Sequence, residues 1–216
     1  QLLGRIPVPE DVITNLAFGG PDRKTVHVTA GKSIFRIPVG VAGYAFADSA
    51  FWEAVLRWGH VLVAIMWIGH LYYFNFTQIP NMPKIPDEQK PAVAKVIAPA
   101  ALFWFRWGAM ATLATGLLLA WNQGYLLQAL SLGLLDGVPK HTLIGIGMWL
   151  AIIMWFNVWF IIWPNQQKAL NIDNKYPNLE AAAKAAAGKT AMLFSRTNTL
   201  LSIPMLVAMT GAQTLG

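Results

Sequence analysis

The sequence predicts an all-α membrane protein, a four-transmembrane-helix bundle preceded by a short extramembrane β meander. Of its 216 residues, 56% are hydrophobic and 12% are charged, whereas soluble domains average about 25% charged residues. Four apolar stretches each approach the ~20 residues that a helix needs to cross a bilayer. These stretches are continuous, unlike the short alternating segments of a transmembrane β-barrel. Since only helices and closed barrels satisfy their backbone in lipid, we expect helices.

Residues 1–45 differ from the rest and form the predicted extramembrane β segment with its linker. NLAF, TVHVT and SIFRIPV are short β-type runs, separated by the turn sequences GGPDRK and AGKS. We therefore expect a three-stranded meander, which needs a partner layer for stability. His27 alternates with Val26 and Val28, so it should face the opposite side of the sheet from these valines. Residues 40–50 are rich in Gly and Ala and indicate a linker.

The transmembrane domain is expected over residues 46–216, with spans at about 51–76, 98–121, 142–163 and 190–213. The run QIPNMPKIPDEQKP after the first span contains four prolines and predicts an extended loop. The run NLEAAAKAAAGKTAM is strongly helix-forming and predicts a helix that leads into the fourth span.

Lysine and arginine predict the orientation. The loops after the first and third spans are rich in Lys, whereas the loop between the second and third spans carries Lys140 alone. The positive-inside rule places the two Lys-rich loops in the cytoplasm and both termini outside. We therefore expect an integral inner-membrane protein of a bacterium with periplasmic termini. The net charge of +6 reflects this orientation rather than binding to nucleic acid.

The chain contains no Cys, which excludes disulfides, thiolate metal sites and a covalently attached c-type haem within it. It starts at Gln1 without a signal-peptide pattern, so we expect a fragment or a processed product.

His60 and His70 lie in the first span and are the first candidates for a site, because histidine is costly in lipid. They are separated by ~15 Å along the helix and about 80° around it, so they cannot share one metal ion. At the depth of His60 the other spans carry Met110, Met148 and Met205. A histidine with a methionine can hold a b-type haem; the alternatives are methionine as a core gap-filler and an interhelical hydrogen bond from His60. No metal other than haem iron is expected.

A second candidate site is a polar layer of His70, Arg106, Asn157 and Asn198, which lie at similar depth in the four spans. An arginine within a span usually pairs, lines a cavity or contacts an anion. The alternative for Arg106 is snorkelling to the inner headgroups. His141, at the outer start of the third span, is expected at the membrane interface.

Two further patterns predict packing rather than chemistry. Gly108, Thr112 and Gly116 form a stripe of small residues that allows close approach of another helix. Several tryptophans fall near the two expected interfaces, as in an aromatic belt: Trp52, Trp58, Trp104, Trp121 and Trp163.

Two parts of the chain resemble known families. LLGRIPVPEDVITNLAFGGPDRKTVHVTAGKSIFRI resembles the last blade of a gluconolactonase/regucalcin-like propeller, but the resemblance implies no lactonase activity here. Residues from about 50 to 216 resemble the membrane domain of membrane-bound urate oxidase, through RWGHVLVAIMWIGHLYYFNF and FWFRWGAMATLATGLLL. This resemblance implies a redox-linked membrane setting and motif positions at His60, His70, Arg106 and Gly108.

Two functions follow as hypotheses. The first is an accessory or scaffold subunit of a larger respiratory or photosynthetic membrane complex, with lipids and other subunits as partners. The alternative is a redox-active subunit of urate-oxidase type that binds haem b or an anionic or quinoid small molecule, with a c-type cytochrome among its partners. Catalytic residues and a substrate are not assigned.

Overall fold

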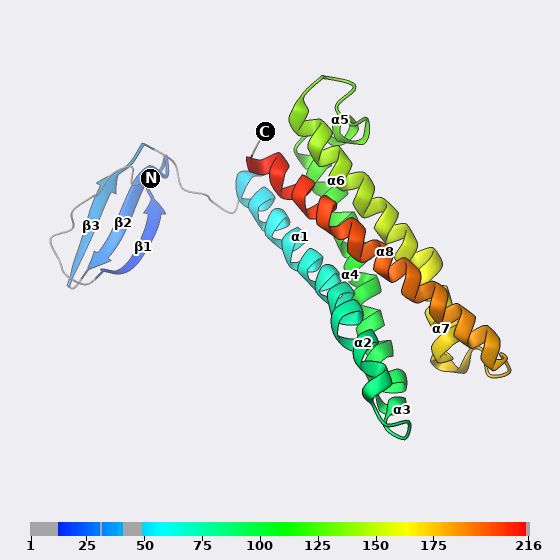
Figure 1. The fold of residues 1–216 in the computed structure, drawn as a ribbon. Helices are drawn as coiled ribbons and strands as arrows, with labels where there is room; N and C mark the ends of the chain where they lie inside the picture. The colour runs from blue at the N-terminus through cyan, green and yellow to red at the C-terminus, as the bar shows by residue number, and fades with distance from the viewer. Residues whose placement is uncertain (1–12, 31, 41–48, 215–216) are drawn as a thin grey trace. The chain divides into compact units, whose positions relative to one another are not determined.

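The structure, a computed structural model, describes residues 13–30, 32–40 and 49–214. It divides into two compact units, with the boundary between Val55 and Leu56. The first unit contains the three strands and the second contains the long helices (Figure 1).

The three strands form an antiparallel meander in the order β1 (Ile13–Gly19), β2 (Thr25–Ala30), β3 (Ser33–Pro38). Val28 in the central strand pairs with Leu16 on one side and Phe35 on the other. The predicted meander is therefore confirmed.

One face of the sheet is apolar. Val26, Val28 and Ala30 are buried, whereas Leu16 on the same face is 57% exposed. His27 faces the opposite side, as its alternation with the valines requires, and its imidazole lies over Gly19 on the neighbouring strand. The incompletely covered apolar face agrees with the small size of a three-stranded sheet.

The second unit contains four helices that are long and apolar enough to cross a membrane: Ala50–Lys84, Lys90–Asn122, Pro139–Leu170 and Ala181–Ala212. The chain is therefore an integral membrane protein, and many large apolar side chains on these helices are exposed for contact with lipid.

Three of the four helices contain a π-helical segment. The first comprises α1 (Ser49–Tyr72), η1 (Tyr73–Gln78), α2 (Ile79–Asn81) and η2 (Met82–Lys84). The second comprises α3 (Lys90–Ala92), η3 (Val93–Ile97) and α4 (Ala98–Asn122). The third comprises α6 (Pro139–Phe156), η4 (Asn157–Ile162) and α7 (Trp163–Leu170). A short 3₁₀ turn, η5 (Ile172–Asn174), follows, and the fourth helix is α8 (Ala181–Thr214).

The expected extended loop after the first span was wrong. Only residues 85–89 lie between the helical segments there. Pro91 occupies the first turn of the second spanning helix, where the missing N–H leaves no intrahelical hydrogen bond unmade. Pro80 and Pro83 lie in the last turns of the first spanning helix, in α2 and η2. Proline therefore does not end the first helix at the apolar run.

The predicted helix leading into the fourth span is confirmed, because α8 runs without a break from Ala181 and contains Pro204. The sequence analysis missed α5 (Leu126–Leu130), which lies between the second and third spans. Trp149 of α6 donates its indole N–H to the carbonyl of Leu130 over 3.0 Å. Gly145 of α6 has no room for a side chain, since the carbonyl of Ala129 fills that position.

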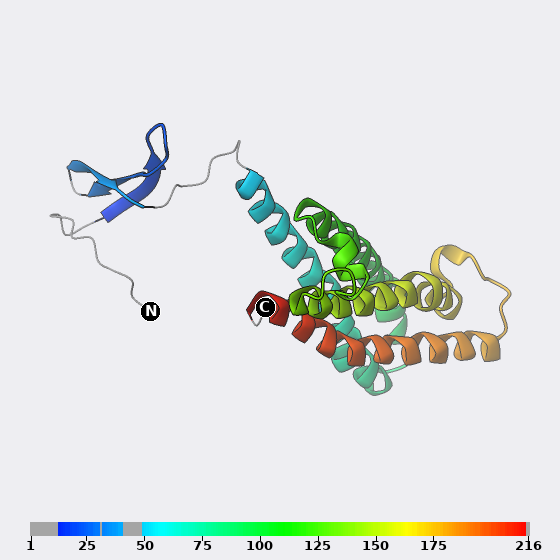
Figure 2. The same ribbon diagram turned by 90° about the horizontal axis from the view of Figure 1, so that it is seen from above.

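The four helices pack around a common core. α6 and α8 lie side by side in both views (Figures 1 and 2). Helix α1 packs against α4 at Gly108, where a Cβ would lie 3.2 Å from the backbone nitrogen of Trp67. The core includes Trp67, Phe105, Met154 and Met205, one from each spanning helix.

Candidate functional site

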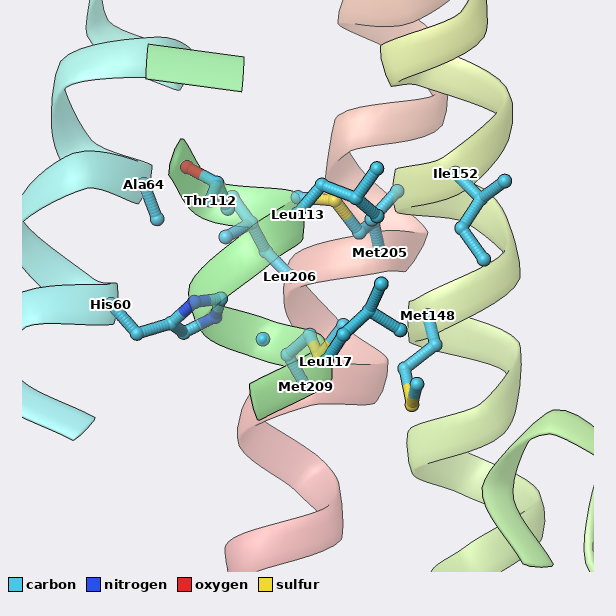
Figure 3. Close-up of a pocket in the computed structure, with 12 residues that line it drawn as sticks. His60, Ala64, Thr112, Leu113, Leu117, Met148, Ile152, Met205, Leu206 and Met209 are labelled. Atoms are coloured by element: carbon cyan, nitrogen blue, oxygen red, sulfur yellow. The ribbon is translucent and has the colours of Figure 1, made fainter. Parts of the chain in front are cut away.

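His60 is a half-buried side chain on α1 that points towards α4 (Figure 3). Its Nδ1 lies 2.9 Å from the hydroxyl oxygen of Thr115. A Cβ at Gly116 would lie 3.0 Å from the His60 Cε1 atom, so only glycine leaves room for the imidazole in its present position. The stripe predicted from Gly108 to Gly116 thus brings α4 against both α1 and its histidine.

The hydrogen bonds around Thr115 determine the tautomer of His60. The Thr115 hydroxyl lies 2.6 Å from the carbonyl of Ala111, which can only accept a hydrogen bond. The hydroxyl hydrogen is thereby used, so Thr115 accepts from His60 through its oxygen. In a neutral imidazole this places the hydrogen on Nδ1 and the lone pair on Nε2. His60 therefore offers Nε2 as a hydrogen-bond acceptor or a ligand.

Two adjoining cavities lie beside His60, and we call them the inner and outer His60 cavities. They share four lining residues: His60, Gly116, Met148 and Met209. The inner cavity has a volume of about 70 Å³ and is bounded by side chains from all four spanning helices, including Ala64, Leu113 and Met205 (Figure 3).

The outer His60 cavity is larger, with a volume of about 380 Å³. Its polar side chains come from different helices and from the segment after α4: Arg57, Gln123, Tyr125, Thr210 and Thr214. Its remaining wall is apolar and includes Val61, Leu119 and Ile144. The volume falls within the range of about 300–1,000 Å³ found for small-molecule sites, and the mixture of an apolar wall with a few polar groups is also typical of them.

The methionines predicted to lie level with His60 divide into two groups. Met148 and Met205 line the His60 cavities. Met110 does not line them, because it lies about 200° around the helix from Thr112, which does. The structure therefore separates Met110 from this site. Met209 lines both cavities and was missed, since it lies one helical turn beyond the depth used for the comparison.

The structure divides the predicted polar layer into three separate places. Asn157 and Asn198 are buried together and joined by a 2.8 Å hydrogen bond between their side chains. Asn198 also donates to the carbonyl of Met154 over 2.9 Å. These two residues connect η4 to α8 in the core.

His70 and Arg106 lie away from the asparagine pair. The His70 Nδ1 donates to the carbonyl of Met66 over 2.7 Å, and the side chain lines an open groove with Gly69, Tyr73 and Ala101. Arg106 stacks instead on the indole of Trp163. The reason is angular: Gly108 faces α1, and Arg106 lies about 200° around α4 from it.

His141 lies beside the outer cavity. Its ring stacks on Tyr125 with centroids 5.6 Å apart, and its Nδ1 lies 2.5 Å from a carboxylate oxygen of Asp136. Partial removal from water raises the pKa of the Asp136 carboxyl, but hydrogen bonds from the Val138 N–H and from His141 lower it by more, so the net pKa lies below its ordinary value. His141 thus orients one wall residue of the cavity.

The residues beside His60 include the donors of a b-type haem. A histidine Nε2 with a methionine sulfur is a known pair of haem ligands, and Met148 and Met209 line both His60 cavities. If haem bound here, His60 and one of these methionines would hold its iron. Among the described residues, no three His, Cys, Asp or Glu side chains come together to hold a metal ion.

Comparison with known proteins gives no relative for this chain: no family model, no curated protein and no solved structure matches it.

Proposed function

We propose that the transmembrane domain binds a quinol, or a similar small apolar ring that carries a hydroxyl group, in the His60 cavities. The observation that carries this proposal is the Nε2 lone pair of His60 beside an apolar cavity of about 380 Å³. A hydroxyl donor matches this lone pair, whereas a carbonyl oxygen does not.

The surroundings of His60 suit such a ring. Met148 and Met209 supply flexible, polarisable side chains that adapt to the face or edge of a ring. The polar side chains of Gln123 and Tyr125 lie elsewhere in the wall of the same cavity, where they can reach a second oxygen. His60 would also be the group that accepts the proton when a bound quinol loses one.

This proposal places the chain as a redox-linked subunit of a larger respiratory or photosynthetic assembly. The resemblance of residues 50–216 to the membrane domain of urate oxidase supports that setting, and a c-type cytochrome is then among the partners that we propose. We also propose the inner membrane of a bacterium, with both termini in the periplasm, on the basis of the Lys-rich loops.

The experiment is a titration of the purified protein with decylubiquinol, followed by intrinsic tryptophan fluorescence. The ligand control is the dimethyl ether of the same quinol, which keeps the ring but lacks the hydroxyl donors. We expect His60→Phe to weaken quinol binding about tenfold, as expected for loss of one hydrogen bond of about 1.4 kcal/mol in a buried site.

The matched control variant is His70→Phe, which removes a histidine with the same tautomer from the same helix but outside the cavity. It should leave the affinity within about twofold, since it removes no direct contact. Equal affinity of the wild-type protein for quinol and its ether, or equal loss in the two variants, would refute the proposal. A Soret band in the absorption spectrum would indicate haem b in the His60 cavities instead of a quinol.

A second function, that of an accessory subunit, is favoured by the groove beside His70. The Nδ1 of His70 donates to the carbonyl of Met66, which leaves Nε2 as an acceptor, and the side chain lines an open groove. Gly69 and Ala101 make this groove shallow enough for close approach of a helix from another subunit. A transmembrane helix with a hydroxyl or amide donor is the partner that we propose there. Co-purification that is lost in His70→Phe and kept in His60→Phe would favour this role.

A further inference from the structure

Arg106 holds a positive charge within a membrane span without an acceptor for its hydrogen bonds. The guanidinium carbon lies 3.8 Å from the ring centre of Trp163 and 5.1 Å from that of Trp159. The Nε atom is buried without a hydrogen-bond partner. In the described part of the chain, no carboxylate forms an ion pair with Arg106 and no oxygen accepts from it.

A second unpaired donor belongs to one of the indoles beside this guanidinium. The indole Nε1 of Trp159 is buried and has no acceptor among the described residues. Stacking on the indoles stabilises the charge of Arg106 through cation–π attraction, but it uses the faces of the guanidinium and not its N–H groups. The guanidinium has five N–H donors and the indole of Trp159 has one, and the described residues supply no acceptor to either side chain.

The position of Arg106 indicates which acceptor can reach it. Trp104 and Trp107 flank it on α4 and are 52% and 45% exposed, as in the aromatic belt at a membrane interface. Arg106 lies fifteen residues before Trp121, or ~22 Å along the helix. Since the hydrocarbon core is ~30 Å thick, an arginine at this depth can extend to the inner phosphates.

The charge around this position is positive. Lys95 and Lys168 are exposed on the helices that carry Arg106 and Trp163, towards the Lys-rich ends of both. Basic residues near an inner leaflet attract anionic lipids, and the planar guanidinium can donate two parallel hydrogen bonds to a phosphate.

We infer that Arg106, held between indole rings, binds the phosphate of an anionic phospholipid. The lipid would supply the missing acceptor for the guanidinium, and its chains would lie along the exposed apolar surface near Trp107. This site is separate from the His60 cavities and does not depend on the function proposed for them.

The inference is tested by native mass spectrometry of the purified full chain in detergent, with phosphatidylglycerol as the anionic probe and phosphatidylcholine as the zwitterionic one. We expect the wild-type protein to prefer phosphatidylglycerol. Arg106→Gln should weaken binding of phosphatidylglycerol at least about tenfold, since it removes a hydrogen bond between two charged groups, and should leave binding of phosphatidylcholine unchanged.

Arg196→Gln is the matched control, because Arg196 is exposed on α8 and stacks on no described aromatic ring. It should retain the preference for phosphatidylglycerol. Arg106→Lys keeps the charge and should fold even if Arg106→Gln does not; we expect it to bind phosphatidylglycerol severalfold more weakly than arginine because it lacks the planar fork.

Three results would overturn the inference. Equal losses in Arg106→Gln and Arg196→Gln would indicate unspecific attraction to positive charge. Displacement of phosphatidylglycerol by inorganic phosphate at equal concentration would identify a site for free phosphate instead. Absence of any preference for phosphatidylglycerol in the wild-type protein would leave a carboxylate of a partner helix as the acceptor.

Discussion

At the scale of single residues, Thr115 has the clearest role in the candidate site. It accepts a hydrogen bond from His60 while it donates its own hydrogen to Ala111, and it thereby decides which imidazole nitrogen faces a ligand. Neither the spacing of the histidines nor the depth of the methionines reveals this role. It arises from the angular relation between α1 and α4, which a single sequence does not contain.

We expect Thr115→Val to weaken quinol binding about as much as His60→Phe, because loss of the Thr115 oxygen as acceptor costs a half-buried Nδ1–H about 1–3 kcal/mol and favours the other tautomer. Nitrogen-15 NMR of labelled histidine would show the hydrogen moving from Nδ1 to Nε2. Thr197→Val is a suitable control, because the Thr197 hydroxyl bonds only to the carbonyl of Leu193 in its own helix. An unchanged His60 spectrum in Thr115→Val would contradict the assignment.

Asp136 predicts a dependence on pH. Because its pKa in the folded protein lies below the ordinary value, the unfolded chain binds more protons in acid. The stabilisation is therefore complete above the ordinary carboxyl pKa and is lost as the pH falls through the lower, folded value. We expect the thermal midpoint of Asp136→Asn to fall less than that of the wild-type protein when the pH is lowered below about 4.

The control for this measurement is Glu88→Gln, which changes an exposed acid in the loop between η2 and α3. The thermal midpoint of Glu88→Gln should depend on pH in the same way as that of the wild-type protein. If Asp136→Asn also follows the wild-type curve, the ion pair with His141 contributes nothing to stability.

At the scale of elements, the long apolar runs predicted the spanning helices, but not where they end. Apolar composition detects the part of a helix that faces lipid, and the ends of these helices carry Lys, Pro and amide side chains instead. The helix α5 was missed because its five residues lie beside Gly133, a residue with positive φ in the turns that follow. Its position depends on the contact between Ala129 and Gly145, which is a tertiary interaction.

The sequence predicted at which depth in the membrane the site residues lie, but not on which side of each helix. Counting residues from the outer end brought Met148 and Met205 level with His60, and both line its cavities. The same comparison of depths wrongly included Met110 in the site and placed Arg106 in one layer with His70. Depth along a helix does not determine on which side of the helix a residue lies. A helical projection of α4 relative to the Gly108 stripe would have separated Arg106 from His70.

The buried pair of Asn157 and Asn198 is expected to hold η4 against α8. We expect each single substitution by Leu to destabilise the protein by about 1 kcal/mol, since interhelical hydrogen bonds in membranes are worth about 0.6–1.7 kcal/mol. The double substitution should cost less than the sum, because it leaves no unpaired amide in the core. Unfolding in mixed detergent micelles measures all four proteins, and strictly additive losses would show that the two side chains do not interact.

At the scale of the whole molecule, the natural absence of Cys allows a direct test of orientation. Glu88→Cys places a thiol between η2 and α3, and Leu134→Cys places one between α5 and α6, where Leu134 is 86% exposed. The positive-inside rule predicts that a membrane-impermeant maleimide added to spheroplasts labels Leu134→Cys and not Glu88→Cys. The reverse pattern would invert the proposed topology.

The length of the four helices has a consequence beyond the bilayer. At 32–35 residues each they measure about 50 Å, against a hydrocarbon core of ~30 Å. A tilt of about 50° would be needed to absorb the difference, beyond the 0–40° seen for membrane helices.

Most of the excess length lies at one end of the bundle. Four helical segments extend beyond the apolar runs, and each contains at least one lysine: residues 77–84, 90–97, 164–170 and 181–189. The bundle therefore continues out of the lipid as a basic helical extension, ~10–14 Å tall if the helices stand upright. A protein in the aqueous phase on that side would contact a positively charged surface formed by the ends of the membrane helices themselves, without a separate domain.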